Sequence, residues 1–165
     1  MFRKQLVELY EYSCFAWDHV MDSCAQIPAE EYFREQPLFW GSLHGLVVHG
    51  WAAERIWLDR LLGTSPTFLH GAEDFADLAA VREVWEPLRA GWRSYIADVD
   101  EATLFGTMTY QATTGETNTV RIHALIHHVL NHATEHRSQM TPVLAQLGHP
   151  TRPLDYIYYQ LDLGL

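Results

Sequence analysis

Histidine stands out in this 165-residue chain, which contains 10 His against 11 Lys and Arg together. Two histidines, His132 and His136, are four residues apart in a segment with helical apolar periodicity. They occupy positions where the apolar seam of Leu125 and Val129 continues toward Val143. Side chains at i and i+4 are neighbours on one helix face, about 6 Å apart at Cβ. Their imidazoles can therefore bind one metal ion at about 2.0–2.1 Å, and we predict a metal site inside a helical bundle.

A metal ion also explains why two histidines would face a bundle interior. Buried imidazoles need hydrogen-bond partners, and two charged imidazoles repel each other. A divalent cation takes one nitrogen of each ring and leaves the other nitrogen to donate to a neighbouring acceptor. The alternative is a pair of core or interface histidines that are satisfied by hydrogen bonds alone.

The best third ligand is His49, which shares a predicted helix face with Leu46, Ala53 and Ile56. His44 lies five residues earlier and about 140° around the same helix, on a different face. Three histidines with an open fourth position are the arrangement of a catalytic or exchangeable metal site. A structural site is instead closed by four ligands, usually with cysteines.

Two further residues are candidates for the surroundings of the site. His128 lies one turn before His132 and is a candidate contact to substrate or to a ligand. Glu135 is a candidate for orienting an imidazole or for a base, with a solvated helix glutamate as the alternative. Arg137 is predicted to form an ion pair between helices. Solvated or structural roles are expected for the other histidines: His19, His44, His70, His123, His127 and His149.

The elements that must position these residues are four segments with helical apolar periodicity, at residues 3–26, 39–62, 75–99 and 120–147. Ser42 is a candidate cap for a slightly later start of the second segment, and Gly63 and Gly148 are plausible C-terminal stops. Pro87 falls inside the third segment, whose apolar seam continues on both sides, so a kink is expected rather than a break.

Residues 103–119 are rich in Thr and aromatic residues, which favours a short β-hairpin of Leu104–Tyr110 against Glu116–Val120. The aromatic-rich tail, Asp155–Leu163, is predicted to form a short helix over the bundle. Four amphipathic helices of this length bury their apolar stripes most simply in a four-helix bundle. We therefore predict an all-α fold, a single domain over residues 1–165, with a hairpin between the third and fourth long helices.

Composition limits the partners. The formal net charge is −10, so the chain lacks the positive field that nucleic acids or anionic membranes attract. No apolar stretch is long enough for a signal core or a membrane span, which favours the cytoplasm. Cys14 and Cys24, placed on one helix, would be about 15 Å apart, beyond disulfide reach.

Residues 44–63 (HGLVVHGWAAERIWLDRLLG) and 131–150 (NHATEHRSQMTPVLAQLGHP) resemble the DinB/YfiT-like superfamily of metal-dependent enzymes. Its hallmarks are one histidine on the second helix and an HxxxHR motif on the last long helix. The resemblance covers essentially the whole chain and implies a four-helix bundle that binds one divalent metal, zinc, nickel or iron, through His49, His132 and His136. It also implies a homodimer and a small-molecule substrate, with a low-molecular-weight thiol as co-substrate. Ser138 departs from the glycine that often follows HR in the family.

Three neutral imidazoles leave the charge of a divalent ion uncompensated, which lowers the pKa of a bound water to about 7 or stabilises a bound thiolate. The chain is therefore expected to be a metal-dependent hydrolase or, as the resemblance favours, a thiol S-transferase or isomerase. Two alternatives stay open. One is a non-catalytic, stress-associated protein that stores or senses the metal, and the other is a metal-free, dimerising helical protein whose histidines respond to pH.

Overall fold

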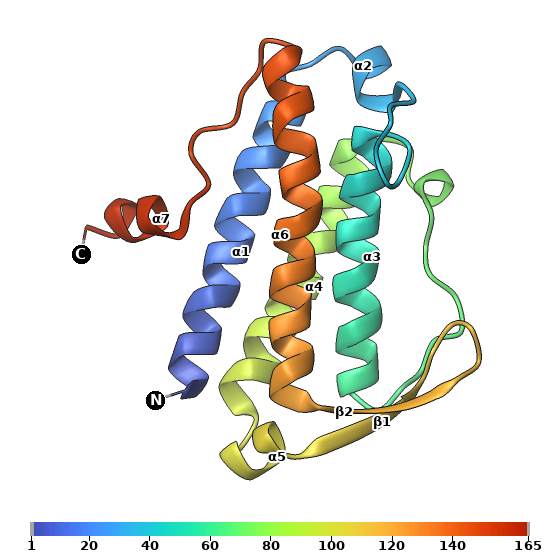
Figure 1. Ribbon diagram of the computed structural model, residues 1–165, viewed down its shortest axis with the longest axis vertical. Helices are drawn as coiled ribbons and strands as arrows, with labels where there is room; N and C mark the ends of the chain where they lie inside the picture. Colours follow the sequence, from blue (N-terminus) through green and yellow to red (C-terminus); the bar gives the residue numbers. More distant parts are fainter. Residues whose placement is uncertain (1, 165) are drawn as a thin grey trace.

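The computed structural model describes residues 2–164, which are mainly helical with one two-stranded antiparallel sheet. The elements, in chain order, are α1 (Phe2–Cys24), α2 (Ala29–Phe33), α3 (Leu43–Leu61), η1 (Ala72–Asp74), α4 (Leu78–Asp98), α5 (Glu101–Phe105), β1 (Thr107–Gln111), β2 (Thr117–Arg121), α6 (Ile122–Gln146) and α7 (Tyr156–Asp162). Four long helices lie side by side, and the hairpin crosses one end of them (Figure 1). The predicted all-α bundle with an intervening hairpin is confirmed.

The order of the helices in space differs from a simple up-down-up-down bundle. Helix α1 packs against α4 and α6, and α3 packs against the same two helices. Figure 1 shows that the chain runs up α1, down both α3 and α4, and up α6, because the segment between α3 and α4 returns along the bundle. Helices α3 and α6 are therefore antiparallel neighbours, which places the middle of one beside the middle of the other.

Helix α3 begins at Leu43 rather than at residue 39, because Ser42 caps it. The Ser42 hydroxyl accepts a hydrogen bond from the Gly45 N–H at 2.9 Å, which satisfies one of the free donors of the first turn. The helix ends as predicted before Gly63, whose φ of 91° is the left-handed conformation that glycine adopts without strain.

Helix α4 begins at Leu78, three residues later than residue 75, for a similar reason. The Asp77 carboxylate accepts from the Ala80 N–H at 2.8 Å and fixes the start. Pro87 lies inside α4, and the helix continues on both sides of it, as predicted.

The hairpin begins later than predicted. Leu104 belongs to α5 and not to β1, because the Asp100 carboxylate accepts from the Thr103 N–H at 2.8 Å and starts a short helix there. The Leu104 side chain is buried under the bundle. Strand β1 then begins at Thr107, which pairs with Arg121 of β2. The second strand leads directly into α6, so the hairpin is anchored beside the first turns of that helix.

The core between the helices is rich in tryptophan. Trp17, Trp85 and Trp92 are fully buried where α1, α3 and α4 meet. Trp40 and Trp57 are instead partly exposed, close to the start and the end of α3.

Cys14 and Cys24 are buried on α1 as free thiols, so the predicted absence of a disulfide is confirmed. Burial raises the pKa of each thiol to about 12, which keeps both protonated at neutral pH. The short helix α7 lies beside the middle of α1 (Figure 1). Within residues 2–164, no helix combines the length and the apolar character needed to cross a membrane.

Candidate metal centre

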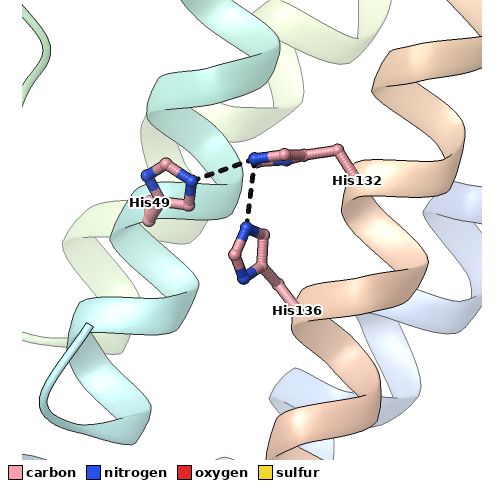
Figure 2. A group of neighbouring side chains, drawn as sticks. All are labelled: His49, His132 and His136. Atoms are coloured by element: carbon pink, nitrogen blue, oxygen red, sulfur yellow. Dashed lines mark hydrogen bonds between the residues drawn. The ribbon is translucent and has the colours of Figure 1, made fainter. Parts of the chain in front are cut away.

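Helices α3 and α6 together bring three imidazoles to one point. His49 lies on the face of α3 that contacts α6, and it is buried together with Leu46 and Ala53 of that face. His132 and His136 lie one helical turn apart on α6, where His136 is buried and His132 is partly exposed. Figure 2 shows that the three rings point toward one another across the gap between the two helices.

The Nε2 atoms are the atoms that converge. His132 Nε2 lies 3.2 Å from His49 Nε2 and 3.1 Å from His136 Nε2 (Figure 2). One ligand atom from each of the three histidines lies within 4.8 Å of the others. Three nitrogens that each bind a tetrahedral ion at about 2.0–2.1 Å would be roughly 3.3 Å apart. The two separations from His132 fit that requirement to within about 0.2 Å, so the residues present suit a divalent metal ion.

Hydrogen bonding alone satisfies this arrangement poorly. A ring nitrogen carries either one hydrogen or one lone pair, so His132 Nε2 can donate to one neighbour but cannot also accept from the other. Its two short contacts, to His49 and His136, therefore compete for a single hydrogen-bonding position. A cation would accept all three lone pairs at once.

The protonation states also suit metal binding. Burial, together with the charges of the neighbouring His136 and His132, lowers the pKa of His49 to about 3. Burial and the neighbouring histidines likewise lower the pKa of His132 to about 4, and burial lowers that of His136. All three rings are thus neutral at pH 7, which is the form that binds metals.

Trp40 forms one wall of the site. Its ring stacks on the His49 ring with centroids 4.0 Å apart and an interplanar angle of 19°. One hydrogen bond and one glycine allow the loop that carries Trp40 to lie close to α3 and α6. The Phe39 N–H donates to the Gln139 side chain of α6 at 3.2 Å, and a Cβ at Gly45 would lie only 2.1 Å from the Trp40 carbonyl oxygen. Glycine at position 45 therefore permits the loop to approach α3.

The neighbouring acceptors expected for the second ring nitrogens are not found. Within residues 2–164, the buried Nδ1 atoms of His49 and His136 have no hydrogen-bond partner. Glu135 lies on the exposed side of α6, although its charge raises the pKa of His136 against the larger effect of burial. The structure therefore gives Glu135 no orienting contact to a ring.

His128 lies next to the cluster but outside it. Its ring centroid is 5.4 Å from that of His132 and 5.4 Å from the Trp57 ring. Burial lowers its pKa, and the charge of Glu135 opposes that shift. His128 thus lies one turn before His132 on α6, on the side of the cluster that faces the hairpin.

The remaining histidines stay away from the cluster. His44 is buried on another side of α3, where its Nε2 lies 3.0 Å from the Ala72 carbonyl oxygen. His70 lies 2.8 Å from the Asp74 carboxylate near the surface. His123 and His127, for which solvated or structural roles were expected, are half-buried against the Phe2 ring.

The ion pair predicted for Arg137 is wrong. Its guanidinium is buried and donates instead to the Ser13 and Thr134 hydroxyls, at 3.1 and 3.0 Å. It also lies over the Trp17 ring, 5.5 Å from the centroid. No carboxylate within residues 2–164 forms a salt bridge with it, and burial lowers its pKa to about 10.

Sequence reasoning also missed a buried carboxylate, Glu54, five residues after His49. Its Oε2 accepts from the Tyr10 hydroxyl at 3.1 Å and from the Trp85 Nε1–H at 3.0 Å. From the sequence alone, a glutamate at this helix position is expected at the surface. Glu54 is buried because nearly all of α3 is buried.

Comparisons with known proteins place the chain in a family. The family model described as "DinB family" matches residues 1–161. The chain is also similar to "Protein DinB" of Bacillus subtilis (strain 168), with 26% identity over 157 residues, which covers 92% of this chain and 91% of that protein.

Proposed function

The chain belongs to the DinB family, and from this premise we propose that it is a metal-dependent enzyme that acts on small molecules. His49, His132 and His136 hold one divalent ion, zinc, nickel or iron. The observation that carries the proposal is the convergence of their Nε2 atoms, with separations of 3.1 and 3.2 Å from His132. The lowered pKa values of the three rings support it, since neutral imidazoles need no deprotonation before they bind.

A divalent ion held by three neutral imidazoles supplies uncompensated positive charge, which stabilises a thiolate or a hydroxide at neutral pH. We propose that the reaction is the transfer of a low-molecular-weight thiol to a small electrophile, or a thiol-dependent isomerisation. Hydrolysis is the variant in which water replaces the thiol. Trp40 stacks on the His49 ring and covers one side of the site, so substrate is expected to approach from a side that Trp40 leaves free.

The second candidate is a non-catalytic, stress-associated protein that binds the metal. It is favoured by one observation: the candidate metal cluster within residues 2–164 consists of histidines alone, with no carboxylate that could act as a base. The two candidates differ in the fourth coordination position, which must be open to a thiol or water in an enzyme.

The decisive experiment is elemental analysis of the purified protein together with anomalous diffraction at the zinc, nickel and iron edges. We expect one ion per chain, with an anomalous peak equidistant from the three Nε2 atoms. His136→Leu should abolish the peak, and His123→Gln, a control on the same helix, should leave it. A protein that takes up no divalent metal under metal-replete conditions would contradict the proposal.

The fourth position is then tested with cobalt-substituted protein. Titration with small thiols should change its absorption spectrum if the position is open. A bound ion that is closed by a further protein ligand, with no spectral response to thiols and no turnover of electrophiles, would favour the non-catalytic candidate.

We also propose a cytoplasmic homodimer. The free, buried cysteines suit a reducing compartment, and Ile157 and Leu161 of α7 expose apolar side chains that a second copy would cover. Light scattering coupled to gel filtration should give twice the 19.0 kDa chain mass. A monomer at micromolar concentration would contradict the dimer without affecting the metal site.

A further inference from the structure

A hollow of about 270 Å³ lies between α3, the hairpin and α6, beside the candidate metal centre. Its lining residues are Trp57, Tyr110, Val120, Ala124, Leu125 and His128. Five of these six side chains are apolar or aromatic, and none is acidic. A chain with net charge −10 thus presents a hollow without negative charge next to three imidazoles.

His128 connects the hollow to the metal centre. Its ring lies 5.4 Å from the Trp57 ring, which lines the hollow, and 5.4 Å from the His132 ring, which belongs to the cluster. A ligand that contacts His128 in the hollow therefore lies beside the ring that neighbours His132.

The aromatic wall of the hollow is held from behind by Arg60. Its guanidinium lies 4.6 Å from the centroids of both the Trp57 and the Tyr110 rings, and it is buried. The two rings meet nearly at right angles, with an interplanar angle of 76°. Such stacking fixes both rings in place, so the wall is preformed, and the cation behind it disfavours a positively charged ligand.

We propose that this hollow binds an uncharged aromatic or similarly planar apolar group of the small-molecule substrate, whose reacting group meets the metal ion. This inference rests on the proposed function, because it assigns the substrate class of the same site. A cavity of about 150 Å³ is enough for benzene, so 270 Å³ accommodates one ring with a small substituent. The aromatic side chains of Trp57 and Tyr110, which line the hollow, offer the ring stacked or edge-to-face contacts.

The test compares two thiols that differ by a ring, benzyl mercaptan and ethanethiol, on cobalt-substituted full-length protein. Absorption titration gives the two dissociation constants. We expect benzyl mercaptan to bind roughly tenfold tighter or more, since even one methylene group in an apolar pocket is worth about tenfold. Ala124→Phe fills the hollow from an exposed helix position and should remove the preference, whereas Ala124→Ser at the same position should keep it.

A preference that is absent, or that survives Ala124→Phe unchanged, would overturn the inference. Amide shift mapping on zinc-loaded protein adds the location: benzyl mercaptan should shift the amides of Trp57, Tyr110 and Ala124. Should the protein bind no metal, the proposed function fails, and benzyl alcohol with metal-free protein still decides the hollow. Shifts at the same three amides would support an aromatic-binding hollow, and their absence at millimolar probe would refute it.

Discussion

Helix α3 carries two buried polar centres five residues apart, and they are built on opposite principles. Around Glu54, donors meet acceptors: its carboxylate accepts from Tyr10 and Trp85, and its main-chain carbonyl accepts from the Trp92 Nε1–H at 3.1 Å. Around His49, three identical Nε2 atoms face one another, and two Nδ1 atoms have no partner within residues 2–164.

This difference between the two polar centres distinguishes one that stabilises the fold from one that is suited to bind a ligand. A polar centre whose donors and acceptors match one another needs nothing further and contributes to stability. A centre made of like groups has its hydrogen-bonding needs unmet by the protein itself, and a ligand such as a cation could meet them. Burial raises the pKa of Glu54, while hydrogen bonds from Trp85 and Tyr10 and the charge of Arg89 lower it, so this network partly offsets the cost of burying a carboxyl group.

The largest effect is expected from His132→Leu. It removes the central ligand, so the affinity for a divalent metal should fall at least about a thousandfold, or about 4 kcal/mol. The stability of the metal-free protein should stay the same or rise slightly, because leucine continues the apolar seam of α6 without a competing nitrogen. Metal titration by calorimetry and urea unfolding with chelator measure the two quantities.

His127→Leu, a half-buried histidine of α6 outside the cluster, is the matched control and should keep its metal affinity. A large loss of metal-free stability in His132→Leu would break the contrast between the two centres, since it would mean that the histidines already stabilise each other.

The reverse pattern is expected for Glu54→Ala. Tyr10 and Trp85 would each lose their acceptor, and an unsatisfied buried donor costs about 1–3 kcal/mol, so unfolding free energy should fall by about 3 kcal/mol. The affinity for metal in the folded protein should change little, because Glu54 contacts none of the three histidines. Urea unfolding gives the stability.

Glu135→Ala, an exposed carboxylate of α6, controls for the loss of a negative charge and should stay within about 0.5 kcal/mol of the parent. A Glu54→Ala variant that keeps its stability but loses metal would reverse the roles of the two centres.

The third prediction concerns pH in the metal-free protein. The folded pKa values of His49 and His132, about 3 and about 4, lie below the ordinary value of 6.5. As the pH falls below 6.5, the unfolded chain takes up protons that the folded chain refuses, so stability decreases down to about pH 4. Each ring contributes up to about 1.4 kcal/mol per pH unit.

His132→Leu removes one of these rings. Between pH 6.5 and 4.5 its unfolding free energy should therefore fall by about 2 kcal/mol less than that of the parent. Unfolding free energies by urea at several pH values, with chelator present, measure the two slopes. If the unfolding free energies of parent and variant depend on pH with the same slope, His132 is protonated as readily in the folded chain as in the unfolded chain, and the prediction is wrong.

The histidine cluster was largely predictable from the sequence because the spacing of its residues is local information. The four-residue spacing of His132 and His136 follows from the helix period, and the same period places His49 on one face of α3. The meeting of the two helices depends on tertiary packing, which apolar periodicity indicated only as a bundle and which the family resemblance supported. The helices α3 and α4 start later than predicted, because a single capping residue, Ser42 or Asp77, decides where each helix begins.

Other parts could not be predicted, because they depend on contacts between distant segments. The short helices α2 and α5 are too brief for a periodic pattern. Glu54 and Arg137 have the sequence context of surface residues, and their burial follows from Trp17 and Trp85, which come from other helices. The stacking of Trp40 on His49 depends on an irregular loop, whose path no periodicity describes.

Trp40→Leu is expected to give the smallest effect and bears on how the incomplete centre is held. The variant keeps an apolar side chain but loses the flat surface that stacks 4.0 Å from the His49 ring. His49 then gains freedom to rotate away from the cluster, because its Nδ1 has no hydrogen bond within residues 2–164 to hold it. Loss of a group that orients a metal ligand typically costs 10–100-fold in affinity, and we expect about tenfold here, or about 1.4 kcal/mol. Trp40→Phe retains a stacking ring and should restore most of the affinity. Calorimetric titration of both variants with zinc measures this, and equal affinities for Trp40→Leu and the parent would mean that packing of α3 alone orients His49.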